Sequence, residues 1–183
     1  GSARIFPLSR IELSKKNLIH NIRQFRNLAN KKTKFSVAIK SNAYGHGQNE
    51  IAKILEPYVD YFQVNSAEEL ELLRKISKKK TLVLGYVQKS DLIKAVKLKC
   101  ILSVFSLEQI WRISAMAEMG KMVQEIHLPV DAYLGREGFL LKDLPEVFAE
   151  IKKCKHIKLS GIYAHFANIE DTTNFFHAQK QIA

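Results

Sequence analysis

Six short apolar stretches alternate with amphipathic stretches along this chain, and this alternation limits the fold more than any other feature. The apolar stretches are rich in valine, isoleucine, leucine and aromatic residues, which favour β-strands. The predicted strands span residues 35–40, 61–64, 81–85, 101–104, 125–131 and 157–165. Strands that alternate with helices are parallel and are joined by helical crossovers. The sequence therefore predicts an α/β fold.

The predicted helices have recognisable first turns. Ser66 to Glu69 and Ser106 to Gln109 match capping boxes, and a similar start lies at residues 143–146. A further helix, capped by Ser14, is expected before the first strand. Apolar residues at helical spacing are expected to face the core: Leu18, Ile22, Phe25, Ala29, Leu70, Leu73, Ile76, Ile110, Ile113, Ala117, Leu144, Val147, Phe148 and Ile151, together with Trp111 and the three methionines.

The number of strand–helix units decides between two parallel α/β folds. A doubly wound dinucleotide-binding sheet would carry Gly-x-Gly-x-x-Gly after its first strand, and that pattern is missing here. A closed (β/α) barrel needs eight units and typically about 250 residues. This chain has 183 residues and six predicted strands. We therefore expect an incomplete barrel over residues 9–183, preceded at 1–8 by a lead-in whose first residues, Gly1-Ser2, are a cloning remnant.

The chain is strongly basic, with a net charge of +11 from 29 basic and 18 acidic residues. Its lysines form separate clusters: Lys31, Lys32 and Lys34; Lys78, Lys79 and Lys80; and Lys152, Lys153 and Lys155. Each cluster lies near the end of a predicted helix, where cations complement the helix dipole. Aromatic residues do not interleave with them as a base-stacking surface would require. Solvated helix ends are thus favoured, and no nucleic-acid partner is expected.

Two further absences narrow the class of protein. No apolar run approaches the roughly 18 residues that a membrane span needs, so no membrane association is expected. Cys100 and Cys154 lack the spacing of metal ligands and form no disulfide framework. We therefore expect a cytoplasmic protein without a metal site.

Residues 37–47, Val-Ala-Ile-Lys-Ser-Asn-Ala-Tyr-Gly-His-Gly, carry the main chemical signal. An apolar strand delivers Lys40 to its carboxyl end, where apolar walls would favour the neutral amine. A neutral lysine in a pocket forms Schiff bases with carbonyl compounds, including pyridoxal phosphate. In barrels the chemistry lies at the carboxyl ends of the strands. Arg136 lies in the loop after the fifth predicted strand and His165 ends the sixth, so both could converge with Lys40 on one ligand.

Three segments resemble motifs of the alanine racemases. Residues 37–47 resemble the family's cofactor-lysine signature, and residues 161–167 are similar to its Thr-His-Phe-Ala motif. Residues 131–139 resemble its Asp-Thr-Gly-Met-x-Arg-x-Gly loop. The resemblance runs from about Ser9 to the end of the chain and covers roughly half of a family member. It implies a partial (β/α)8 TIM-like barrel with about six βα units, without the family's C-terminal β-domain.

The resemblance also implies an activity and a role for each site residue. The activity is the pyridoxal phosphate-dependent interconversion of L-alanine and D-alanine, which supplies D-alanine for cell-wall peptidoglycan. Lys40 would hold the cofactor as a Schiff base and exchange the α-proton. Tyr44 would lie beside the cofactor phosphate, Leu84 would form an apolar wall, and His165 would stack on the cofactor ring. Arg136 would contact the cofactor's phenolic oxygen and the substrate carboxylate.

Departures from the family pattern surround the arginine. Ala132 and Tyr133 replace a Thr-Gly pair, and Pro129 stands where many members carry a carbamylated lysine that steadies the arginine. By resemblance, a second catalytic tyrosine comes from the partner subunit, and the arginine that faces the ring nitrogen lies beyond Ala183. We therefore expect a homodimer. The isolated chain is expected to self-associate through exposed barrel edges and to be inactive alone.

Other functions stay open at this point. A pyridoxal phosphate-dependent decarboxylase or a racemase of broader substrate range would share a lysine at a strand end. A non-catalytic pyridoxal phosphate-binding barrel is the non-enzymatic alternative, and a nucleic-acid-binding module is the least favoured one.

Overall fold

Six parallel strands form a single sheet in the computed structural model, which describes residues 9–167 and 175–182. The strands are β1 (Ser36–Ala38), β2 (Tyr61–Val64), β3 (Thr81–Val83), β4 (Ile101–Ser103), β5 (Gln124–Pro129) and β6 (Ile157–Tyr163). Their order in the sheet is their order in the chain. A doubly wound sheet would reverse its order at a switch point. The sheet therefore winds in one direction, which confirms the predicted α/β partial barrel.

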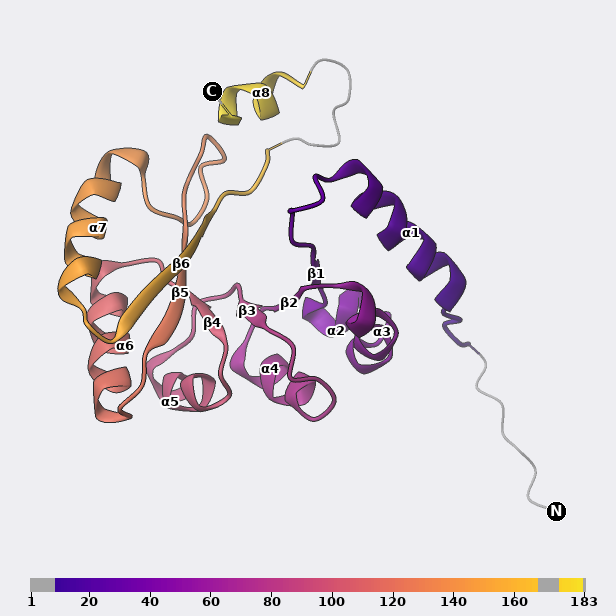
Figure 1. The fold of residues 1–183 in the computed structure, drawn as a ribbon, viewed down its shortest axis with the longest axis horizontal. Coiled ribbons are helices and arrows are strands. Elements are labelled where there is room, and N and C mark those ends of the chain that lie inside the picture. The colour runs from indigo at the N-terminus through magenta and orange to yellow at the C-terminus, as the bar shows by residue number, and fades with distance from the viewer. Residues whose placement is uncertain (1–8, 168–174, 183) are drawn as a thin grey trace.

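Helices alternate with the strands, and most of them cover the outer face of this curved sheet (Figure 1). They are α1 (Lys15–Leu28), α2 (Lys40–Tyr44), α3 (Gln48–Leu55), α4 (Ala67–Arg74), α5 (Lys89–Lys97), α6 (Leu107–Met119), α7 (Leu144–Lys153) and α8 (Phe176–Ile182), with 3₁₀ turns at Glu56–Tyr58 and Leu141–Asp143. Figure 1 shows α3 to α7 in an arc outside the strands, whereas α1 and α8 lie on the side that the arc leaves open.

The core lies between the sheet and this arc of helices. Phe62 and Val64 of β2 and Leu70 and Leu73 of α4 are fully buried there. Most of the predicted apolar helix residues are buried or partly buried against the same core, including Ile110, Ile113 and Ala117. Burial of such side chains stabilises the fold by about 1.5–3 kcal/mol each.

Three of the predicted helix caps are confirmed. The hydroxyls of Ser14, Ser66 and Ser106 each accept the backbone N–H three residues on, at 3.2–3.3 Å. The start predicted at residues 143–146 has no such side-chain cap, because the 3₁₀ turn Leu141–Asp143 runs directly into α7.

The first and last predicted strands are longer than the observed ones. The β1 ladder ends with the bond from the Ile39 N–H to the Gln63 carbonyl (2.8 Å), after which the chain turns. Pairing of β6 with β5 ends at Tyr163, opposite Pro129. Lys40 and His165 therefore follow their strands instead of ending them. Strand ends depend on neighbouring strands as much as on apolar content.

Three residues predicted to be in the core are exposed instead. Phe25 is 59% exposed, Trp111 50% and Met119 86%. Phe25 lies on α1, and its ring lies beside the Phe35 ring, with 6.1 Å between centroids. The Trp111 indole lies at the surface and donates to Glu150 at 3.3 Å. Helical spacing identified the apolar faces of the helices, but it does not show how much of each face the neighbouring elements cover.

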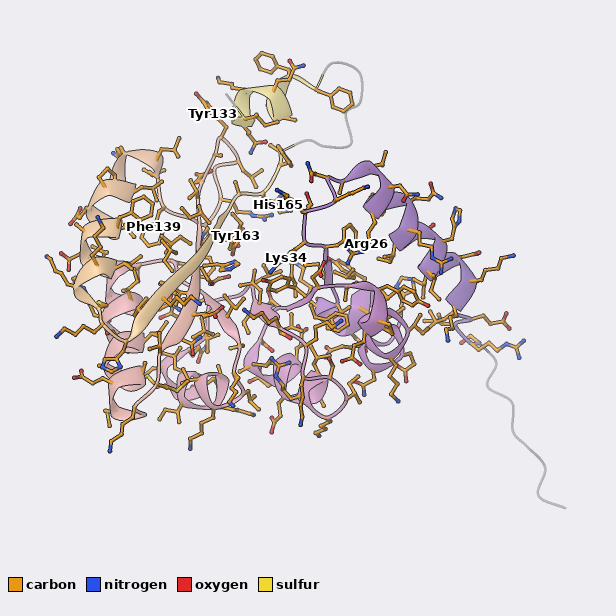
Figure 2. The ribbon with its side chains drawn as sticks, in the orientation of Figure 1. Arg26, Lys34, Tyr133, Phe139, Tyr163 and His165 are labelled. Carbon is orange, nitrogen blue, oxygen red and sulfur yellow. The ribbon has the colours of Figure 1, made fainter. Side chains whose placement is uncertain are left out.

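Hydrogen bonds of Arg26 link α1 to the edge of the sheet. Its guanidinium donates to the Tyr58 carbonyl (3.0 Å) and to Asp60 (2.9 Å), and Asp60 also accepts the N–H of Phe35 at 2.7 Å. The hydrogen bond from Phe35 and the Arg26 charge hold the pKa of Asp60 below its usual value. Figure 2 shows Arg26 on the α1 side of β1.

The lysine clusters lie at helix ends and in the loops that lead into strands. Lys31, Lys32 and Lys34 separate α1 from β1, and Lys78 and Lys80 precede β3; all five are exposed. These loops meet the amino ends of the strands. None of the helices in the described part of the chain is long and apolar enough to cross a bilayer.

Candidate active site

A cavity of about 470 Å³ opens at the carboxyl ends of the strands. All five residues that the sequence singled out line it: Lys40, Tyr44, Leu84, Arg136 and His165. They come from the segments after β1, β3, β5 and β6. Because the sheet winds in one direction, these segments meet at the opening of the cavity, called the mouth below. Figure 2 shows His165 beyond Tyr163, toward the side where α1 and α8 lie. Lys40 is half-buried, so it is less enclosed than the sequence predicted.

The backbone that follows Lys40 is wound left-handed. Ser41, Asn42, Ala43 and Tyr44 have φ between 52° and 57°. This conformation costs roughly 1–2 kcal/mol per residue for L-amino acids. The turn therefore needs contacts that hold it. One comes from α3, where the N–H of Gln48 donates to the Asn42 side chain at 2.8 Å.

A second contact comes from Glu69 in the first turn of α4. One carboxylate oxygen accepts the N–H of Ser41 at 2.7 Å, and the other accepts the N–H of Asn65 at 2.6 Å. The carboxylate thereby joins the lysine turn to the carboxyl end of β2. The sequence identified Glu69 only as part of a capping box, because no local pattern reports a contact across 28 positions.

Hydrogen bonds within the loop that carries Arg136 close it. The Asp131 side chain accepts the N–H groups of Leu134 (3.1 Å) and Gly135 (2.9 Å), and the Phe139 N–H donates to the Pro129 carbonyl at 2.9 Å. Arg136 itself is exposed, with its Nε 3.6 Å from a Glu137 carboxylate oxygen. Its guanidinium is therefore free to turn toward an anionic ligand in the cavity.

Hydrogen bonds hold helix α8 beside the opening of the cavity. The Gln181 side chain donates to the carbonyls of His165 (2.9 Å) and Ala132, and it accepts the N–H of Ala167 at 2.7 Å. Lys180 lies over the Tyr133 ring, 4.3 Å from its centroid, and Figure 2 shows Tyr133 next to α8. The two residues that depart from the expected loop pattern, Ala132 and Tyr133, thus contact α8.

Tyr163 and His127 are among the cavity-lining strand residues that the sequence analysis did not single out. The Tyr163 hydroxyl donates to Ser103 at 2.9 Å, and burial raises the pKa of Tyr163. Burial also lowers the pKa of His127, which favours its neutral imidazole. The period of two in a strand could have found His127, because its neighbours Ile126 and Leu128 are both fully buried on the other face.

Comparison with protein-family models identifies the family of this chain. The family model described as "Alanine racemase, N-terminal domain" matches residues 13–183. The chain belongs to the alanine racemase family. The alanine racemase of Methanococcus maripaludis is 36% identical over 156 residues, which is 84% of this chain and 42% of that protein.

Solved structures agree with this membership. The alanine racemase of Clostridium difficile 630 superposes with a TM-score of 0.84 at 31% identity, over 91% of this chain and 44% of that one. A histidine racemase from Leuconostoc mesenteroides subsp. sake superposes with a TM-score of 0.83 at 25% identity, over 93% of this chain and 46% of that one. The chain therefore spans less than half the length of these alanine and histidine racemases.

The lining of the cavity fits the pyridoxal phosphate that the sequence analysis expects. Its volume falls within the ~300–1,000 Å³ of small-molecule sites. Among the described residues that line it, Lys40 supplies the only primary amine and Arg136 the only guanidinium. Leu82 and Leu84 add apolar wall, which suits an aromatic ring. An amine, a permanent cation and apolar surface match the aldehyde, the anionic groups and the ring of this cofactor.

Proposed function

We propose that the protein to which this chain belongs interconverts L-alanine and D-alanine with pyridoxal phosphate, and that this chain carries the cofactor lysine. The observation that supports the proposal is the placement of Lys40. It lines a cavity together with Arg136 and His165, and the three residues follow three different strands of an alanine racemase-family fold.

Each residue at the mouth has a defined role in this proposal. Pyridoxal phosphate, when bound, supplies a conjugated ring that stabilises negative charge at the substrate α-carbon. Lys40 holds the cofactor through its amine and then, as a free amine, removes or returns the α-proton on one face of the substrate. Arg136 binds the substrate carboxylate and the cofactor's phenolic oxygen, because its charge is permanent and its donors form a planar fork.

The remaining lining residues position the cofactor. The exposed Tyr44 follows the lysine turn and would lie beside the cofactor phosphate. His165 would stack on the ring, and Leu84 would form its apolar wall. A tyrosine of the partner subunit would serve the opposite face of the substrate, so the working enzyme is a homodimer. We place it in the cytoplasm, supplying D-alanine for peptidoglycan.

The test is incubation of the complete protein, of which this chain is part, with L-alanine in deuterium oxide. Racemisation predicts D-alanine that carries deuterium at the α-carbon, and the Lys40→Ala variant should form none. Release of ethylamine would instead identify a decarboxylase. Alanine recovered without deuterium, despite bound cofactor, would identify a non-catalytic cofactor-binding protein.

A racemase of broader range is the second candidate. It is favoured by the similarity to the Leuconostoc histidine racemase and by the altered loop at Ala132 and Tyr133. Racemisation of L-alanine and L-histidine by the same preparation separates the two. A higher kcat/KM for alanine supports the first proposal, and a higher value for histidine supports the second.

A further inference from the structure

Glu69 and Gln109 occupy equivalent places in two helices of this fold. Each lies three residues after a serine cap, Ser66 in one case and Ser106 in the other. Each accepts the N–H of the residue before its cap: Glu69 from Asn65 at 2.6 Å and Gln109 from Phe105 at 2.9 Å. A side-chain amide is therefore sufficient for this local bond.

The two side chains differ in what their second polar atom does. The Gln109 amide nitrogen is buried and has no hydrogen-bond partner among the described residues. The second oxygen of Glu69 accepts the N–H of Ser41 at 2.7 Å. A carboxylate can accept on both oxygens, whereas an amide would present its NH₂ to one of the two N–H groups. The carboxylate at position 69 is thus required to accept from Ser41 and Asn65 together, whereas an amide is sufficient for the local bond alone.

Ser41 is the residue directly after Lys40 and the first of the left-handed turn. The backbone of Glu69 reaches the same turn by a second route. Its carbonyl accepts from the Gln48 side chain at 2.8 Å, and the Gln48 N–H in turn donates to Asn42. The first turn of α4 therefore supports the lysine turn at two points.

We propose that Glu69 is a positioning residue for Lys40. By holding the Ser41 N–H against the end of β2, it fixes the strained turn so that the Lys40 amine faces the cavity. The nature of the ligand that Lys40 captures rests on the function proposed above, but the positioning itself does not.

The test compares Glu69→Gln with Gln109→Ala in the 183-residue chain. Glu69→Gln can keep only one of the two bonds, and Gln109 shows that an amide makes the one to the residue before the cap, so the bond to Ser41 is expected to be lost. Gln109→Ala removes the equivalent local bond in α6. Pyridoxal phosphate is titrated by its visible absorption, and borohydride reduction with peptide mapping locates the attached cofactor. Loss of a hydrogen bond to a charged group predicts at least about tenfold weaker uptake at Lys40 in Glu69→Gln. Gln109→Ala should take up cofactor like the unaltered chain.

Equal affinity and an equal share of label on Lys40 in Glu69→Gln and the unaltered chain would overturn the proposal. If the unaltered chain takes up no cofactor at Lys40, the proposed function fails, and two cofactor-free measurements then decide the role of Glu69. They are amide exchange at Ser41 and the rate of reductive methylation of Lys40 relative to the exposed Lys53.

The proposal predicts that Glu69→Gln exchanges the Ser41 amide at least about tenfold faster and changes the relative methylation rate of Lys40. Amides in α6 should exchange as before, which shows that the variant is folded. An unchanged Ser41 amide together with an unchanged Lys40 rate would contradict it.

Discussion

Gly161 lies so close to the His127 ring that any side chain there would displace it. A Cβ on Gly161 would be 2.6 Å from two ring atoms of His127. We expect Gly161→Ala to destabilise the fold by about 1–3 kcal/mol in urea denaturation, as overpacking does. Gly161→Ala combined with His127→Ala should lose much less than the sum of the two single variants. Additive losses would show that the ring is not the obstacle.

His127 also gives the stability a defined pH dependence. Burial lowers its pKa below the usual value of about 6.5, and the nearby Glu125 only partly offsets this. The unfolded chain therefore takes up the proton first as the pH falls. The contribution of neutral His127 to the unfolding free energy is complete above about pH 6.5. It is lost as the pH falls from there through the pKa of His127 in the folded state. Unfolding free energies between pH 7.5 and pH 5, roughly the range over which histidines titrate, should fall less steeply in His127→Gln than in the unaltered chain. Parallel slopes would contradict this.

At the scale of elements, Arg74 joins the end of α4 to the loop before β3 and the loop before β4. Its half-buried guanidinium donates to the carbonyls of Leu98 (2.8 Å), Lys79 (3.1 Å) and Lys99 (2.9 Å). Arg74→Met leaves these acceptors without their donor and should cost about 1–3 kcal/mol of unfolding free energy. Arg112→Met, which breaks an exposed i,i+4 pair with Glu108, is the matched control and should cost about 0.5 kcal/mol or less. Equal losses would show that Arg74 acts only as a surface charge.

The elements themselves were largely predictable, since their signals are local. Serine caps and apolar spacing placed α1, α4 and α6, and the predicted β2 matches the observed strand. The ends of β1 and β6 were not predictable, because hydrogen bonding to a neighbouring strand decides where a strand stops. The exposure of Phe25 and Trp111 was missed for the same kind of reason, since it depends on elements far away in the sequence.

The site was predictable where a residue follows a strand. Lys40, Arg136 and His165 meet because parallel strands in sequential order bring their carboxyl ends together. Glu69 and Gln181 were not predicted, since their roles consist of contacts to residues 28 and 16 positions away, Ser41 and His165.

At the scale of the whole molecule, the sheet has two open edges. Among the described residues, β1 pairs only with β2 and β6 only with β5. Ile162 on the edge strand β6 is 51% exposed. We expect the 183-residue chain to associate as its concentration rises in sedimentation velocity experiments. Ile162→Lys should reduce association, while Ile93→Lys on α5, where the isoleucine is 56% exposed, should not. A monomer at all concentrations would contradict this.

Borohydride trapping of pyridoxal phosphate on the unaltered chain, followed by peptide mapping, tests the central claim most directly. The account predicts a visible absorption band and a label concentrated on Lys40, with both lost in Lys40→Arg. A label scattered over the exposed lysines, or a band that survives in Lys40→Arg, would show that this cavity is not the cofactor site.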